Sequence, residues 1–139
     1  MNQVNLTGQR LADAGGLPAV LAAGWDVFEL IAAIASASAG ESPGMYPAFT
    51  FARGAAASGR NAIACAPAMP PVPADAARSQ TKPAGDVDEV ADALAGLASA
   101  LSSRLREAAG LAAETADRSA CLDAASDAER IARLLTKEN

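Results

Sequence analysis

The strongest pattern of apolar positions lies between residues 17 and 39. Residues that recur there at intervals of three and four fall on one broad arc of a helix with 3.6 residues per turn; they are Val20, Leu21, Gly24, Val27, Phe28, Ile31 and Ile34. Trp25 lies at the edge of this arc, and Asp26 and Glu29 lie on the other side. The pattern predicts a buried helix at the centre of the core.

Residues with strong positional preferences mark where the first helices start and stop. Pro18 suits the first turn of the central helix, and Gly40 suits the position after its last turn. An earlier short helix is expected to be capped by Asn5 or Thr7 and to stop before Gly15. The chain is therefore predicted to form two helices before residue 40.

Two further helices are expected before the chain becomes rich in proline. Ser42 followed by Pro43 is a capping pair that predicts a third helix through Ser58. Gly59 is expected to break this helix, because glycine is unfavourable inside helices. Residues 60–66 are then expected to form a short fourth helix, which the following proline ends.

A proline-rich stretch divides the chain. Five of the eight prolines fall between residues 67 and 86, and four of those lie within 67–73. Each proline fixes its own φ and disfavours helix in the residue before it, so the run predicts extended polyproline II. Its PxxP spacing also occurs in docking motifs, but a semi-rigid spacer is the preferred interpretation.

The C-terminal third has the pattern of two packed helices. Asp86 followed by Glu89 is a capping-box pair at a helix start. A narrow apolar seam follows, made of Val90, Leu94, Leu97, Leu101, Leu105, Ala108 and Leu111. A second seam consists of Leu122, Ala125, Ala128, Ile131, Ala132 and Leu135. One helix over 87–137 would be about 75 Å long, so a hairpin that turns within 114–119 is preferred over a single rod.

The pattern and the composition together predict an all-α fold: a small helical bundle with a proline-rich spacer and a C-terminal helical hairpin. Alanine accounts for 38 of the 139 residues and only 4% are aromatic, so the chain lacks the side chains typical of β-sheet proteins. We expect an N-terminal helical unit at 1–66, a linker at 67–86 and a hairpin at 87–139. The two helical parts should dock into one composite domain, because neither buries much surface alone.

The charge balance disfavours nucleic acid as a partner. The chain carries 11 basic and 16 acidic residues, a net charge of −5, which opposes binding to a polyanion. Residues 43–66, where a helix-turn-helix would fall, contain only Arg53 and Arg60 as basic residues. Asp26 and Glu29 make the central helix unfavourable as a membrane span. We therefore expect a cytoplasmic protein, bacterial by its arginine-rich and alanine-rich composition, with no membrane and no nucleic-acid partner.

Several common chemistries lack the residues they need. The chain has no histidine, which removes the usual general base and the commonest metal ligand. Cys65 and Cys121 form no CxxC motif, and both are expected to be small, buried, reduced thiols. We therefore predict no catalytic residue, no metal ion and no cofactor.

The aromatic residues suggest one alternative function. All five lie between residues 25 and 51, and Asp26 and Glu29 have Arg53 and Arg60 as available counter-ions. Arginine forks also bind carboxylates and phosphates. This alternative is a small-molecule binding protein or a small enzyme with a pocket for an anionic or aromatic ligand, lined by Trp25, Glu29, Tyr46, Arg53, Arg60 and Asn61.

The preferred interpretation is a non-catalytic interaction or regulatory protein that acts through helix–helix binding. Phe49 and Phe51 are two positions apart on a helix and cannot both face the same neighbour, so Phe51 is expected at an interface. The small residues of 52–59 allow helix backbones to approach closely. The other predicted interface residues are Val90, Leu94, Leu97 and Leu101 of the first seam. The chain is predicted to be a homodimer, with another protein as a further candidate partner.

Overall fold

The computed structural model describes residues 2–40, 43–71 and 86–136. Within them the chain forms five α-helices, one 3₁₀ helix and no strand. The elements are α1 (Asn2–Asp13), α2 (Leu17–Ala39), the 3₁₀ helix η1 (Pro43–Met45), α3 (Tyr46–Ala64), α4 (Val87–Leu111) and α5 (Thr115–Leu135). The predicted all-α bundle is confirmed. Ser42 and residues 72–85 of the predicted spacer lie outside the described residues.

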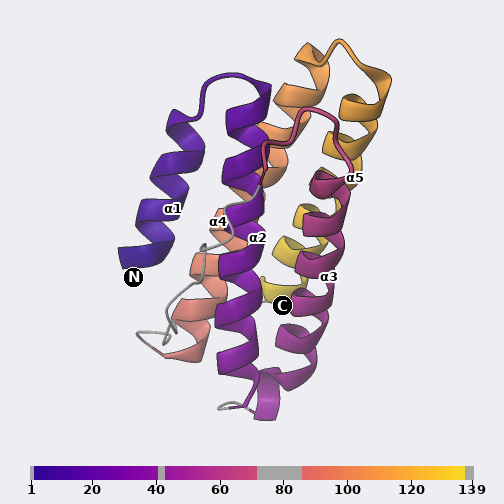
Figure 1. Ribbon diagram of the computed structural model, residues 1–139. Helices are drawn as coiled ribbons and strands as arrows, with labels where there is room; N and C mark the ends of the chain where they lie inside the picture. Colours follow the sequence, from indigo (N-terminus) through magenta and orange to yellow (C-terminus); the bar gives the residue numbers. More distant parts are fainter. Residues whose placement is uncertain (1, 41–42, 72–85, 137–139) are drawn as a thin grey trace.

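Four of the helices form a bundle in which each packs against two neighbours (Figure 1). α2 packs against α3, α3 against α5, α5 against α4, and α4 against α2, so the four form a closed ring. Neighbouring helices in the ring run antiparallel, and α1 lies outside it against α2 and α4. The helices on either side of the predicted spacer thus share one hydrophobic core.

Large apolar side chains from α2, α3 and α4 fill the centre of the bundle, whereas α5 contributes mainly small ones. The buried apolar residues of α5 are four alanines and Cys121, with Ile131 and Leu135 as the only larger ones. Small side chains allow close approach, which brings polar groups of α5 within hydrogen-bond distance of α3 and α4. The large, fully buried side chains of the other helices include Phe28, Leu30, Ile31, Ile34, Phe49, Ile63, Leu94, Leu101 and Leu105.

α2 is the central helix, as its pattern predicts. All seven residues of the predicted arc are buried, and Trp25, Asp26 and Glu29 are only partly covered. By length and composition alone α2 is also apolar enough to cross a membrane. Its position between α1, α3 and α4 accounts for that apolar character within the bundle.

The predicted helix break at Gly59 is wrong. α3 continues through Gly59 to Ala64, so most of the predicted short helix over 60–66 belongs to α3. Gly59 faces the ring of Phe28 in α2, and a Cβ atom there would lie closer than 3.0 Å to three ring atoms. Glycine permits this close approach, and the packing it allows offsets a helix penalty of about 1 kcal/mol relative to alanine.

Other helix boundaries differ from the prediction by a few residues. α1 already begins at Asn2, so Asn5 and Thr7 lie inside it, and Thr7 is buried rather than at a cap position. α3 begins at Tyr46, after η1, instead of at the expected Pro43. Asn5 and Thr7 lie inside α1, and Pro43 begins η1, so none of the three marks the start of an α-helix.

The C-terminal hairpin is confirmed. Asp86 Oδ1 accepts a 2.9 Å hydrogen bond from the Glu89 backbone N–H, and Glu89 Oε1 accepts a 3.0 Å hydrogen bond from the Asp86 N–H, so the capping box forms. α4 and α5 are separate helices joined by a turn at residues 112–114, at the start of the expected segment. The two predicted seams are buried or partly buried except at Leu111 and Leu122, which are 85% and 40% exposed.

Candidate functional site

Three of the predicted ligand-binding residues come together between α2 and α3. Arg60 Nη1 lies 2.5 Å from Glu29 Oε2, and the Arg60 guanidinium lies 5.7 Å from the centroid of the Trp25 ring. Of the ion pairs that the sequence makes available to Asp26 and Glu29, the one between Glu29 and Arg60 forms. Because Glu29 offsets the charge of the guanidinium, the attraction of Arg60 for an anionic ligand is weakened.

The other three predicted ligand-binding residues lie elsewhere. Arg53 donates a 3.4 Å hydrogen bond to Ser36 Oγ. Tyr46 is exposed at the start of α3, fourteen residues and thus about 21 Å along the helix from Arg60. Asn61 lines a groove on another side of α3, toward α5. The six residues therefore do not line a single pocket.

The leucine seam predicted as an interface lies inside the chain's own core. Val90, Leu94, Leu97 and Leu101 are each 5% exposed or less, because α1, α2 and α5 enclose this side of α4. The spacing correctly indicates a packing surface, but the covering helices belong to the same chain. In this fold the four residues are not available to a partner, which corrects the prediction.

Phe49 and Phe51 lie in opposite environments, as their spacing predicts. Phe49 is fully buried, whereas Phe51 is 63% exposed. The small residues of 52–59 divide in the same way: Gly54 and Ser58 are exposed, and the buried ones are Ala52, Ala55, Ala56 and Gly59. Most of the small-residue segment therefore packs within the chain, and its outer side continues from Phe51.

An open groove of about 450 Å³, the α3/α5 groove, runs between the end of α3 and the middle of α5. Ser58 Oγ donates a 3.0 Å hydrogen bond to Asp127 Oδ2, which ties the two helices together along the groove. Asp127 is buried, whereas Asp123 is exposed. The lining consists of Ser58, Asn61, Ala62, Cys65, Asp123, Ser126 and Asp127. This lining holds two carboxylates and no basic side chain, so the groove favours a cationic group.

A second groove, between α4 and α5, is lined by three hydrogen-bonded polar residues, Ser102, Arg106 and Glu129. Arg106 donates from Nε and Nη2 to Glu129 Oε2 at 2.9 and 2.6 Å, and Ser102 Oγ lies 3.2 Å from the same oxygen. The hydrogen bond from Arg106 is the main cause that lowers the pKa of Glu129; partial burial opposes it, and Ser102 and the charge of Arg133 add to it. Because Arg106 and Glu129 form an ion pair across the two helices, we interpret this network as a link between α4 and α5.

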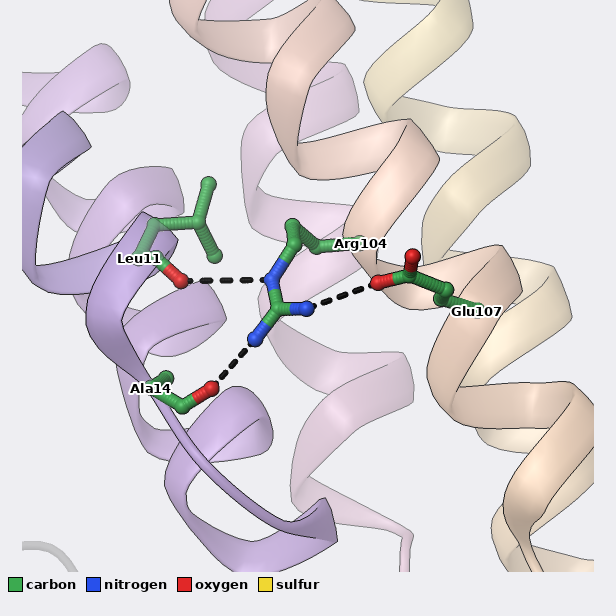
Figure 2. Close-up of polar contacts among 4 residues, drawn as sticks. All are labelled: Leu11, Ala14, Arg104 and Glu107. Carbon is green, nitrogen blue, oxygen red and sulfur yellow. Dashed lines mark hydrogen bonds and ion pairs between the residues drawn. The ribbon is translucent and has the colours of Figure 1, made fainter.

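Arg104 of α4 anchors α1 to the bundle (Figure 2). Its Nε donates to the Leu11 carbonyl oxygen at 3.3 Å, its Nη2 donates to the Ala14 carbonyl oxygen, and its Nη1 donates to Glu107 Oε1 at 2.7 Å. The last carbonyls of a helix have no partner within the helix, so Arg104 caps the end of α1. In the sequence it is only a charge at the margin of the seam, which gives no signal for this role.

Two buried aspartates of α5 are also absent from the sequence predictions. Asp117 is 4% exposed and accepts a 2.9 Å hydrogen bond from the Ala68 N–H, which fastens the segment after α3 to the start of α5. Asp127 fastens the middle of α5 to α3 through Ser58. Both aspartates lie in helical register with the buried Ala124. A carboxylate on the apolar side of an amphipathic helix is the signal that identifies such residues.

The two cysteines differ in exposure, which corrects the expectation that both are buried. Both are free; Cys121 is buried and Cys65 is exposed beside the α3/α5 groove. Burial, and to a smaller extent the charge of Asp117, raises the pKa of the Cys121 thiol. Cys65 is therefore the thiol open to reagents.

No group of three or more His, Cys, Asp or Glu side chains in the described part of the chain is placed to hold a metal ion. Comparison of the chain with protein-family models, curated proteins and solved structures finds no match. Function is therefore inferred from the geometry of the bundle; the exposed side of α3 and α5 combines an exposed phenylalanine with an acidic groove.

Proposed function

We propose that this protein is a non-catalytic helical interaction protein that binds another helix through the outer side of α3 and α5. We call this surface the α3/α5 face; it comprises Phe51, Ser58 and Ala62 of α3 and Leu122, Asp123, Ser126 and Arg130 of α5. The observation that carries the proposal is the 63% exposure of Phe51 on the helix that lines the α3/α5 groove.

Phe51 is suited to anchor a partner. Phe51 and Ser58 are seven residues apart on α3 and so lie on the same side of that helix, about 10.5 Å apart along its axis. Ser58 bonds to Asp127 of α5, so this is the side of α3 toward α5. Fully burying a phenylalanine side chain stabilises by roughly 1.5–3 kcal/mol, and buried aromatic anchors dominate many interfaces.

The α3/α5 groove, which begins two turns along α3 from Phe51, supports the same proposal. Ser58, Ala62 and Ser126 present small side chains along it, which allow a partner helix to approach closely. Leu122 adds a 40% exposed apolar side chain on α5. An exposed apolar anchor together with a groove of small and acidic residues fits a partner helix that presents both an apolar and a basic side chain.

The alternative function is a small-molecule binding protein or a small enzyme with a site at Trp25 and Arg60. The Glu29–Arg60 ion pair weighs against it, because the group that would recognise an anion is already engaged at 2.5 Å. Titrating the fluorescence of Trp25, the only tryptophan, with inorganic phosphate tests this alternative. A saturable change that Arg60→Gln removes would favour it over the interaction function.

Site-specific photo-crosslinking tests the proposed function. A photoreactive phenylalanine derivative replaces Phe51 in one variant and Leu6 in the control; Leu6 is 52% exposed on α1, so the two positions match in exposure and differ in face. In the source cells we expect one discrete adduct from position 51 alone. The additional substitution Ser126→Arg, which blocks the groove, should suppress it. No adduct from position 51, or equal adducts from both positions, would rule the proposal out.

A further inference from the structure

We infer that the occupant of the α3/α5 face is a second copy of this chain, bound with the two α5 helices antiparallel about a two-fold axis near Ser126. In this arrangement Asp123 of each protomer pairs with Arg130 of the partner subunit. This assignment rests on the proposed function, since it names the partner of the same face.

The charges along the outer side of α5 are arranged for self-pairing. Asp123 and Arg130 are both exposed and are seven residues apart, so they lie on one side of α5, about 10.5 Å apart along its axis. Ser126 lies between them. A two-fold axis at this level sets Asp123 opposite Arg130 of the partner subunit, and the symmetry produces this pair twice. A parallel pairing would instead set like charges side by side, which is unfavourable.

The side chains at the crossing point favour close contact. Ser126 at the axis is exposed and small, as is Ser119 two turns along the same side of α5, so two α5 backbones can approach each other. Leu122, in the same exposed stripe, supplies apolar area from both protomers. Phe51 adds a further apolar side chain on the neighbouring helix of each protomer. The interface therefore has small side chains at its centre, charged pairs on either side of them, and apolar side chains farther from the axis.

The α3/α5 groove is an acidic site that can bind Arg130 of the partner subunit. Asp123 and Asp127 give it two carboxylates, and its described lining has no basic side chain to neutralise them. Ser58 and Asn61 line the same groove and offer further polar oxygens. Arg130 of the partner subunit would supply the cation that the groove lacks, so each groove is completed only by the second copy.

Charge-reversal variants of the full chain test the inference by sedimentation equilibrium at micromolar concentration. The wild-type chain should be a dimer. D123R faces Arg130 of the partner subunit with a like charge, and R130D does the same for Asp123, so each should raise the dimer dissociation constant by roughly tenfold or more. D92R, at an exposed aspartate of α4, is the matched control and should leave the constant unchanged. Circular dichroism verifies that every variant keeps its helix content.

Mixing the two variants gives the decisive result. In an equimolar mixture of D123R and R130D chains every facing pair is again opposite in charge, so a heterodimer should form although neither variant dimerises well alone. A wild-type chain that stays monomeric, or a dimer that neither reversal weakens, would overturn the inference. If the wild type is monomeric while position 51 cross-links to a different protein, the second-copy assignment fails and the proposed function stands.

Discussion

The ring of Phe28 in α2 packs directly on the backbone of Gly59 in α3. Both residues are buried, and a Cβ atom on Gly59 would come closer than 3.0 Å to three ring atoms. The two helices can approach at this point because residue 59 has no side chain. The next residue along each helix is Glu29 or Arg60, so the contact also sets the distance across which these two side chains pair.

Gly59→Ala should therefore destabilise the protein, although alanine favours helix. Overpacking a buried site costs about 1–3 kcal/mol, and the gain in helix propensity offsets about 1 kcal/mol of this. Urea denaturation should show a lower free energy of unfolding, by up to about 2 kcal/mol. Combining the change with Phe28→Leu, which removes the clashing ring atoms, should give less destabilisation than the sum of the two single changes.

Gly54→Ala is the matched control on the same helix. Gly54 is exposed, and a Cβ atom there would have no neighbour within 4 Å. This substitution should raise the free energy of unfolding by up to about 1 kcal/mol. Equal effects at positions 54 and 59 would contradict the role assigned to the Phe28 contact.

Arg104→Met should loosen α1 more than the rest of the bundle. The substitution keeps most of the apolar stem but removes the donors to the Leu11 and Ala14 carbonyls, and hydrogen bonds from charged groups are worth roughly 1.5–3 kcal/mol. The Arg104 side chain is 28% exposed, so we expect a loss at the lower end of that range. Hydrogen exchange should accelerate selectively at the α1 amides. Glu107→Gln removes only the ion pair and should leave that exchange nearly unchanged.

The two thiols should differ sharply in reactivity toward iodoacetamide. The folded chain should be labelled at Cys65 alone, because Cys121 is buried and its raised pKa disfavours the reactive thiolate. Unfolding in urea should make both thiols reactive. Asp117→Asn should leave Cys121 protected, because burial contributes more to its pKa than Asp117 does. Rapid labelling of Cys121 in the folded chain would contradict the packing of α5.

Glu129 should titrate below the ordinary range of a glutamate. Arg106 is the main cause, so Arg106→Gln should raise the pKa of Glu129, and Ser102→Ala should raise it less. Since the folded state holds the charged form more strongly than the unfolded state, this contribution to stability is present above the unfolded pKa and is lost as the pH falls through the folded pKa. Carbon-detected NMR of the side-chain carboxyl measures the titration; an ordinary midpoint would contradict the network.

The periodicity of apolar residues predicts where the helices of this chain lie better than it predicts which side of each helix faces the core. On α2 the large apolar residues form a single arc, and the predicted arc is the buried one. On α5 the buried side is formed largely of alanine and few large apolar residues, so the pattern marks the edge of that side less sharply. The predicted seam therefore includes Leu122, whereas the core actually takes Cys121 and Ala124.

The contacts that sequence reasoning misses join residues far apart in the chain. Glycine is required at position 59 because the ring of Phe28 packs there. The carbonyl groups that Arg104 binds belong to Leu11 and Ala14 at the end of α1, 90 or more residues earlier. In contrast, local spacing alone predicts that Phe49 and Phe51 lie on different sides of α3, one buried and one exposed. An apolar seam such as that of Leu94 and Leu101 shows that something covers it, but only the tertiary structure identifies the covering helices as part of the same chain.

Native mass spectrometry of the protein taken directly from its source cells tests most directly whether this chain acts by pairing through the α3/α5 face. It reports the number of subunits and any retained small molecule in one measurement. We predict a ligand-free homodimer of two 13.9 kDa chains. A monomer that carries a stoichiometric extra mass would contradict this and would direct attention to the Trp25–Arg60 alternative.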